Sequence, residues 1–189
     1  MHFDRPLIAA VANPMLEAAL WQKLKRRSDT TGSLGELEPL AVRLGLMQNS
    51  LKPAFEAPQI MIFAADHGLA VDGVGASERH STTEVVHHLL TSQMPLAVFA
   101  RIQGLALSVV DCGVAEAIPP HARLLARKIA HGTRNARGGP AMSHDQVLAA
   151  VRAGMELAES LPGNVRACAG VGVGSHASAA LVLSRLSGA

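Results

Sequence analysis

An apolar stretch at residues 59–65 constrains the fold most, because it ends abruptly in an acid, an imidazole and a glycine at 66–68. In open α/β sheets, ligands bind at the carboxyl ends of the strands. The same design recurs at 109–113 and, without the acid, at 167–174. Each such end can also be a simple turn, since Asp and Gly are common turn residues. Together, the repeats predict three strand ends that face one crevice.

The body of the chain alternates apolar strand patterns with helical ones. This alternation favours right-handed crossovers and a mostly parallel sheet flanked by helices, which is an α/β fold. The apolar content of 49% suits strands that are buried on both faces. A Ser-x-x-Gln capping box starts one helix at Ser143. We expect strands at 59–65, 106–112 and 165–171, helices at about 14–27, 36–48, 82–91, 93–103, 143–160 and 176–187, and a proline-broken link through Pro119 and Pro120.

Two helices precede the first strand, so we divide the chain into two parts. Residues 1–50 are expected to be an amino-terminal helical segment that belongs to a small domain. Residues 51–189 are expected to form the α/β domain, incomplete at its carboxyl end. The helices have two possible places, as a small layer beside the sheet or as a cap over its crevice. The basic run at 23–27 fits a charged last helical turn better than a phosphate-binding patch.

Composition argues against several function classes. Aromatic residues make up 3% of the chain, with one Trp and no Tyr, so base stacking on an aromatic platform is disfavoured. The net charge is +2, and the scattered basic residues are a poor electrostatic match for nucleic acid. We therefore expect no nucleic-acid partner.

The cysteines and the amino terminus indicate a reducing compartment and no metal. Cys112 and Cys168 fall in predicted buried strands without a zinc-ligand spacing, so we interpret both as small buried hydrophobes. The start of the chain lacks a signal-peptide pattern, and no run approaches the roughly 20 apolar residues of a membrane helix. We expect a cytoplasmic protein without a membrane anchor, a metal or a cofactor.

Two loops carry the candidate chemistry. The loop after residue 68 holds three carboxylates and leads into a helix, where Ser81 or Thr82 can serve as the cap. Glu84 is either a first-turn acid or a ligand-binding group, and capping is favoured over ligand binding for Thr82. The glycine-rich segment 170–178 ends a strand and opens a helix, a geometry that suits phosphate. Its glycines are also explained by close packing of helix on strand.

Six motifs follow one another along the chain: GSLGELE at 32–38, FAADHG at 63–68, VVDCGV at 109–114, KIAHGTRN at 128–135, PAMS at 140–143 and GVG at 172–174. Taken in this order, they resemble the nicotinate-nucleotide:dimethylbenzimidazole phosphoribosyltransferase family of cobalamin lower-ligand biosynthesis. The resemblance implies a Rossmann-like sheet, a homodimer, and transfer of phosphoribose from nicotinate mononucleotide to a benzimidazole nitrogen.

The resemblance also assigns candidate site residues. Family members continue past this chain, and their general-base glutamate lies in that further region, so no catalytic residue is expected within 1–189. Gly75 stands where the family has a serine, Glu84 where it has a glutamine, and Gly170 where it has a second glutamate. The family's Asn-Thr-Thr becomes Ser-His-Ala at 175–177, where His176 is either a replacement donor or a surface residue. The candidate substrate-binding residues are Asp66, His67, Gly75 and Glu84, and the candidate phosphate-binding residues are Gly172, Gly174, Ser175 and His176.

Three functions remain open from the sequence. The chain is a transferase whose missing half comes from another chain, a non-catalytic module that binds a nucleotide or an aromatic base, or a truncated remnant. The sheet is expected to have an unpaired edge after the last strand, and exposed edges invite pairing. We therefore expect a homodimer or a complex with a chain that supplies the missing half.

Overall fold

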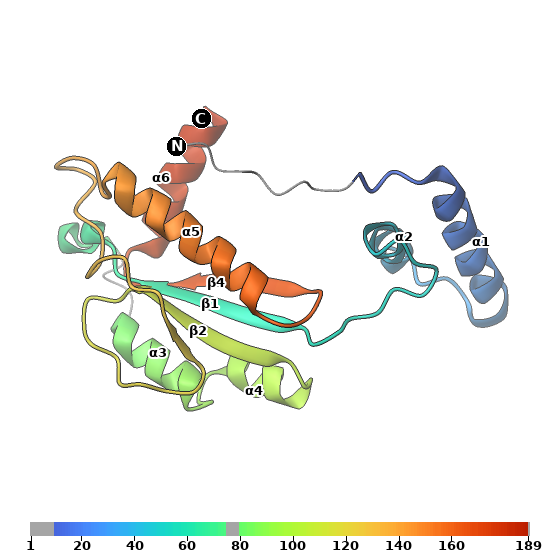
Figure 1. The fold of residues 1–189 in the computed structure, drawn as a ribbon, viewed down its shortest axis with the longest axis horizontal. Helices are drawn as coiled ribbons and strands as arrows, with labels where there is room; N and C mark the ends of the chain where they lie inside the picture. Colours follow the sequence, from blue (N-terminus) through green and yellow to red (C-terminus); the bar gives the residue numbers. More distant parts are fainter. Residues whose placement is uncertain (1–9, 75–79, 189) are drawn as a thin grey trace. The chain divides into compact units, whose positions relative to one another are not determined.

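The computed structural model describes residues 10–74 and 80–188 and divides the chain into two compact units, Met1–Ala54 and Phe55–Ala189 (Figure 1). The sequence-based boundary after residue 50 falls close to this division. Helices α1 and α2 form the first unit, and the second unit holds the sheet with its flanking helices. Gly75, one of the candidate site residues, lies outside the described part of the chain.

The first unit is a pair of helices, α1 (Pro14–Thr31) and α2 (Leu37–Met47). Asn13 caps α1, because its side chain accepts a hydrogen bond from the backbone N–H of Leu16. The helices approach closely, since a Cβ on Gly45 would lie 2.7 Å from the Leu20 side chain. Helix α1 continues past the expected end at residue 27, so the interpretation of 23–27 as a last turn is wrong. The hydroxyls of Thr30 and Thr31 donate to carbonyls one turn back, which keeps polar residues inside the helix.

A parallel four-stranded sheet in the order β3-β2-β1-β4 forms the second unit. The predicted strands are present as β1 (Gln59–Ala65), β2 (Ala106–Gly113) and β4 (Arg166–Val171). The sequence analysis missed β3 (Leu124–Ala126), a three-residue strand within the link that follows Pro120. In register, Gln59 stands opposite both Ala106 and Arg166, so β1 is central and its neighbours end at the same edge as it does.

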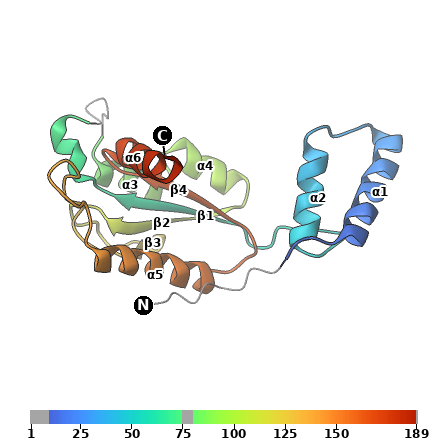
Figure 2. The same cartoon turned by 90° about the horizontal axis from the view of Figure 1, so that it is seen from above.

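Helices cover both faces of the sheet. Figure 1 shows α5 (His144–Ser160) over one face, and α3 (Thr82–Leu90) and α4 (Pro95–Ile102) over the other. Figure 2 shows α6 (Ser175–Ser187) on the β4 side of the sheet, away from β3. The capping box predicted at Ser143 is confirmed, because the Ser143 side chain and the Gln146 side chain each accept from the other's backbone N–H.

The core lies between the central strands and helices α3 and α4. Val86 and Leu89 of α3 pack with Ile62 and Ala64 of β1 and with Val109 of β2. In the described part of the chain, no helix is long and apolar enough to cross a membrane.

Strand β4 and helix α6 stand apart from this core. Residues 167–170 of β4 are exposed, and none of the thirteen residues of α6, all of them described, is buried. Cys168 is exposed, so its interpretation as a buried hydrophobe is wrong. The physical reason is that β4 lies at the edge of the sheet, where it pairs with β1 on one side.

Candidate functional site

The three strand ends predicted to share a crevice lie together. Beyond β1, the backbone N–H of Asp66 donates to the carbonyl of Gly113 at the end of β2, with an N···O distance of 3.0 Å. The next N–H, that of His67, donates to the carbonyl of Val173 beyond β4 at 3.2 Å. Backbone hydrogen bonds therefore join the tip of β1 to the chain on both sides of it.

Both carboxylate oxygens of Asp66 are engaged within the protein. Oδ1 accepts a hydrogen bond from the Thr82 hydroxyl at 2.5 Å, and Oδ2 accepts from the backbone N–H of Ala115 at 2.7 Å. The Thr82 oxygen in turn accepts from the N–H of Val173 at 3.1 Å. Thr82 is not the cap of α3, because Ser81 accepts from the N–H of Glu84 and fills that role. The sequence analysis considered Thr82 only as a helix cap or a ligand-binding residue and missed its bridging position.

The glycine turn after β4 packs directly against the end of β1. A Cβ on Gly172 would lie 1.7 Å from the carbonyl oxygen of Ala65, and a Cβ on Gly174 would lie 3.3 Å from Cβ of His67. Gly174 has φ +80° and precedes the first residue of α6, Ser175. Close packing therefore accounts for both glycines. Phosphate binding by Gly172, Gly174, Ser175 and His176 stays a prediction.

The first turn of α6 leads away from this packed turn. The N–H of Ser175 donates back to the carbonyl of Gly172 at 3.0 Å, and the side chain of His176 is exposed. Because α6 begins here, the positive end of its dipole faces the same end of the sheet as the strand tips.

A small cavity of about 180 Å³ opens at the strand tips, which we call the tip cavity. Its lining residues come from several elements: His67 from the segment after β1, Cys112 from β2, and Gln146 from α5. This volume is below the roughly 300 Å³ typical of sites for drug-sized ligands, so it suits one small flat base. The tip cavity is lined by Ala65, His67, Cys112, Gly113, Ile129, Ala130, Gly132, Thr133, Met142, Gln146 and Ala150.

The tip cavity is apolar and contains no thiolate at neutral pH. Burial, with a smaller contribution from the Asp111 carboxylate, raises the pKa of Cys112 to about 11. No carboxylate is among the described residues that line the cavity. Its wall can therefore receive a flat apolar ring, but the described lining carries no carboxylate for proton transfer.

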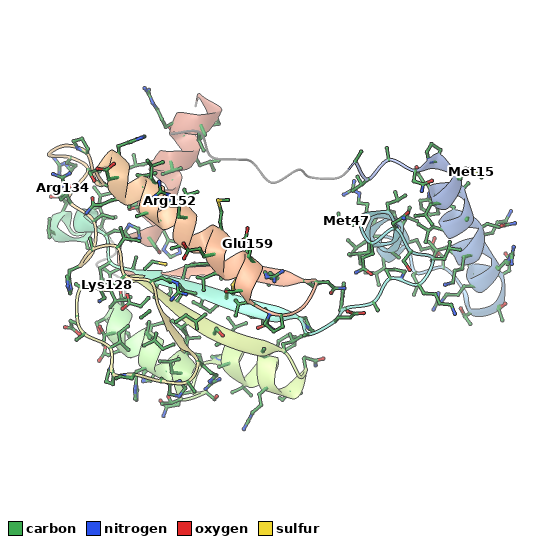
Figure 3. The ribbon with its side chains drawn as sticks, viewed as in Figure 1. Met15, Met47, Lys128, Arg134, Arg152 and Glu159 are labelled. Atoms are coloured by element: carbon green, nitrogen blue, oxygen red, sulfur yellow. The ribbon has the colours of Figure 1, made fainter. Side chains whose placement is uncertain are left out.

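A buried ion pair holds the end of β2 in place. The carboxylate of Asp111, which is 5% exposed, accepts from the N–H groups of Gly113 and Val114 through Oδ1. Its Oδ2 lies 3.2 Å from Nζ of Lys128, which also donates to the carbonyls of Val114 and Glu116. Figure 3 shows Lys128 and Arg134 at the strand-tip end of the sheet. This pairing was missed in the sequence because nothing local links residues 111 and 128.

Glu84 lies in a second hollow. Its carboxylate accepts from the N–H of Ser81 at 2.8 Å, and this hydrogen bond is the main reason that the pKa of Glu84 is lowered from its ordinary value of 4.5. The Glu84 side chain is 58% exposed and lines a cavity of about 450 Å³ between α3 and the loop that contains Ile118 and Pro119. The structure thus groups Asp66 and His67 with the glycine turn and places Glu84 in a separate cavity. Substrate binding by Asp66, His67 and Glu84 stays a prediction.

No cluster of three or more His, Cys, Asp or Glu residues among those described is arranged to hold a metal ion.

Comparisons with known proteins agree on one family. A family model described as Phosphoribosyltransferase matches residues 9–189. The chain is 41% identical over 183 residues to a nicotinate-nucleotide–dimethylbenzimidazole phosphoribosyltransferase of Variovorax paradoxus. The alignment covers 97% of this chain and 52% of that relative. A relative of the same name from Cupriavidus taiwanensis is 38% identical, with 97% and 53% covered.

The fold gives the same result. A crystal structure of the phosphoribosyltransferase of that name from Thermus thermophilus superposes with a TM-score of 0.83 at 31% identity, over 94% of this chain and 55% of that one. The chain spans about half the length of the curated relatives it matches. The resemblance found in the sequence motifs and the expected α/β fold are therefore confirmed, and the chain belongs to the nicotinate-nucleotide–dimethylbenzimidazole phosphoribosyltransferase family.

Proposed function

We propose that this chain provides the substrate-binding part of a phosphoribosyltransferase that moves phosphoribose from nicotinate mononucleotide to a benzimidazole-type base. The observation that carries the proposal is an apolar cavity at the ends of β1 and β2, one of whose lining residues, His67, donates its backbone N–H to Val173 just before the start of α6. A flat ring needs such a slot, and a 5′-phosphate is stabilised by the N–H groups and dipole at a helix start. Gly172, Gly174, Ser175 and His176 are the residues we propose for the phosphate.

The reaction needs a general base, and the described lining of the tip cavity supplies no carboxylate for that role. The glycosidic bond between C1′ and the nicotinate nitrogen breaks, and nicotinate leaves with the bonding electrons. The unprotonated ring nitrogen of the incoming azole bonds to C1′, and the proton on its other ring nitrogen passes to a general base. No described carboxylate lines the cavity, and Cys112 is a neutral thiol. We propose that the base is a carboxylate from the part of the relatives that this chain does not span.

The surface around β4 supports a contact between this chain and that part of the family fold. Strand β4 pairs with β1 alone among the described strands, and on α6 the side chains of Leu181, Leu183 and Leu186 are 54%, 67% and 81% exposed. Exposed apolar surface next to an open strand edge is typical of an interface. We propose that this surface binds the complementary half, and that a homodimer is the alternative assembly. A cytoplasmic location remains part of the proposal.

A non-catalytic binding module is the second candidate function. The observation that favours it is that both oxygens of Asp66 are held by protein donors, so the carboxylate nearest to the strand tips already serves the fold. Such a module would bind a nucleotide or a base and release no product.

Two measurements separate these functions. Calorimetric titration with nicotinate mononucleotide tests binding, and nicotinate release in the presence of 5,6-dimethylbenzimidazole tests transfer. We expect the chain alone to bind the nucleotide without releasing nicotinate. We expect release when the unaligned part of the Variovorax paradoxus relative is added.

Each other outcome contradicts a specific statement. Release by the chain alone would show that the base lies within it. Binding that never leads to release would favour the binding module. No binding at all would leave the chain as a remnant. Light scattering that shows a stable monomer, alone and with the added part, would count against both proposed assemblies.

A further inference from the structure

The Asp66–Thr82 pair links parts of the chain in a way that helix capping does not explain. We propose that this hydrogen-bonded pair positions the 172–175 turn and so sets the affinity of the site for the phosphate group of a nucleotide. Asp66 and Thr82 are then positioning residues, which act through Val173 rather than by touching the ligand. The inference rests on the proposed function, which places the phosphate at this turn.

The Thr82 hydroxyl uses its donor and an acceptor position at once. It donates to Oδ1 of Asp66 and accepts from the N–H of Val173, with distances of 2.5 and 3.1 Å. Thr82 is 3% exposed, so water cannot easily replace either bond. Loss of the hydroxyl would leave two polar groups at the end of the sheet unsatisfied, which is more costly than loss of an exposed hydrogen bond.

The second oxygen of Asp66 extends the link to β2. Oδ2 accepts from the N–H of Ala115, just beyond that strand. One carboxylate therefore connects the end of β1 to the chain after β2 directly and to the chain after β4 through Thr82. The side chain of a single residue thus adds to the backbone hydrogen bonds that join the three strand ends.

Val173 is the point at which this link controls the turn. Its N–H is held by Thr82, and its carbonyl accepts from the N–H of His67. The residues on either side, Gly172 and Gly174, have no side chains, and their backbone packs against the end of β1. The direction of the N–H groups that follow, at the start of α6, therefore depends on how the peptide at Val173 is held. Anion binding at a helix start requires those groups to point at the ligand.

Three variants separate positioning from general stability. Thr82→Val keeps the shape of the side chain and removes the hydroxyl, whereas Thr82→Ser keeps the hydroxyl. Leu89→Val is the matched control, because Leu89 is also 3% exposed on α3 and belongs to the hydrophobic core away from the link. Each variant is made in the full chain.

Binding and local exchange are both measured. We expect Thr82→Val to weaken the calorimetric affinity for nicotinate mononucleotide about tenfold, the effect of losing the one hydrogen bond that holds the N–H of Val173. Thr82→Ser should bind within about twofold of the parent, and Leu89→Val likewise. Amide hydrogen exchange at residues 173–176 should accelerate in Thr82→Val relative to the strand amides of β1, and should not do so in Leu89→Val.

The two measurements keep the inference apart from the proposed function. If the parent chain binds no nucleotide, the proposed function fails, and the exchange pattern still decides the positioning role. Equal changes in Thr82→Val and Leu89→Val, or exchange that rises uniformly, would overturn the inference. If Thr82→Val does not fold, Asp66→Asn takes its place, because a carboxamide offers one acceptor oxygen where the carboxylate offers two.

Discussion

Strands β1 and β4 are both expected from the sequence to be buried, and their environments are opposite. In β1, Met61, Ile62 and Ala64 are between 0% and 3% exposed, whereas residues 167–170 of β4 are all exposed. β1 has a strand on each side and a packed helix layer, and β4 has one neighbouring strand and a following helix with no buried residue. Burial of a strand is therefore decided by its neighbours, and an apolar sequence alone does not provide it.

The proposed phosphate site lies where these two regions meet. His67, which packs against the glycine turn, belongs to the segment that follows the buried β1. The glycine turn itself follows the exposed β4. The Asp66–Thr82 pair crosses this junction. A rigid half thus holds a weakly packed half in register, and substitutions in the two halves should differ in their effects.

The largest expected contrast is between core and surface truncations. Ile62→Ala removes a side chain that is 2% exposed in β1 and should lower the free energy of unfolding by about 2–5 kcal/mol. Leu186→Ala changes a side chain that is 81% exposed on α6 and should alter it by less than about 0.5 kcal/mol. Urea unfolding followed by circular dichroism measures both. A large loss at Leu186 would mean that the α6 face is already buried in a self-assembled form.

A contrast of intermediate size is expected between two glycines at the end of β4. Gly172→Ala forces a Cβ against the carbonyl oxygen of Ala65 and should cost about 1–3 kcal/mol. Gly170→Ala is the control, because its Cβ meets no atom within 4 Å. The same unfolding assay applies, and equal effects of the two substitutions would contradict the close contact between the turn and β1.

Much of the fold was predictable because it depends on local patterns. The strands that became β1, β2 and β4 and the helix capped by Ser143 are visible as apolar runs and cap residues. The three-residue β3 was missed because so short a strand has no periodicity and exists only through its pairing with β2. The exposure of Cys168 was missed because the sequence does not say which strand lies at the edge.

The candidate site was predictable to the level of segments and not of contacts. The acid and glycine signals located the strand ends correctly. The hydrogen bonds of Asp66 to Thr82 and of Thr82 to Val173 join residues 16 and 91 positions apart, and the pairing of Asp111 with Lys128 is equally non-local. Such partners are chosen by the packed tertiary structure, so no sequence motif identifies them.

The smallest expected effect on stability is that of substituting the exposed Cys168, and the reactivities of the two cysteines are expected to differ clearly. Alkylation with iodoacetamide requires the thiolate. Burial raises the pKa of Cys112 from 9.0 to about 11, which lowers its thiolate fraction about 100-fold at neutral pH. Exposed Cys168 should therefore be labelled first, and the Cys168→Ser variant should label slowly until the pH rises toward 11. Mass spectrometry of the tryptic peptides follows both sites. Equal labelling rates of the two cysteines would show that Cys112 is not shielded in the tip cavity. If the labelling of Cys168 slows only when the complementary half is added, that half lies over β4.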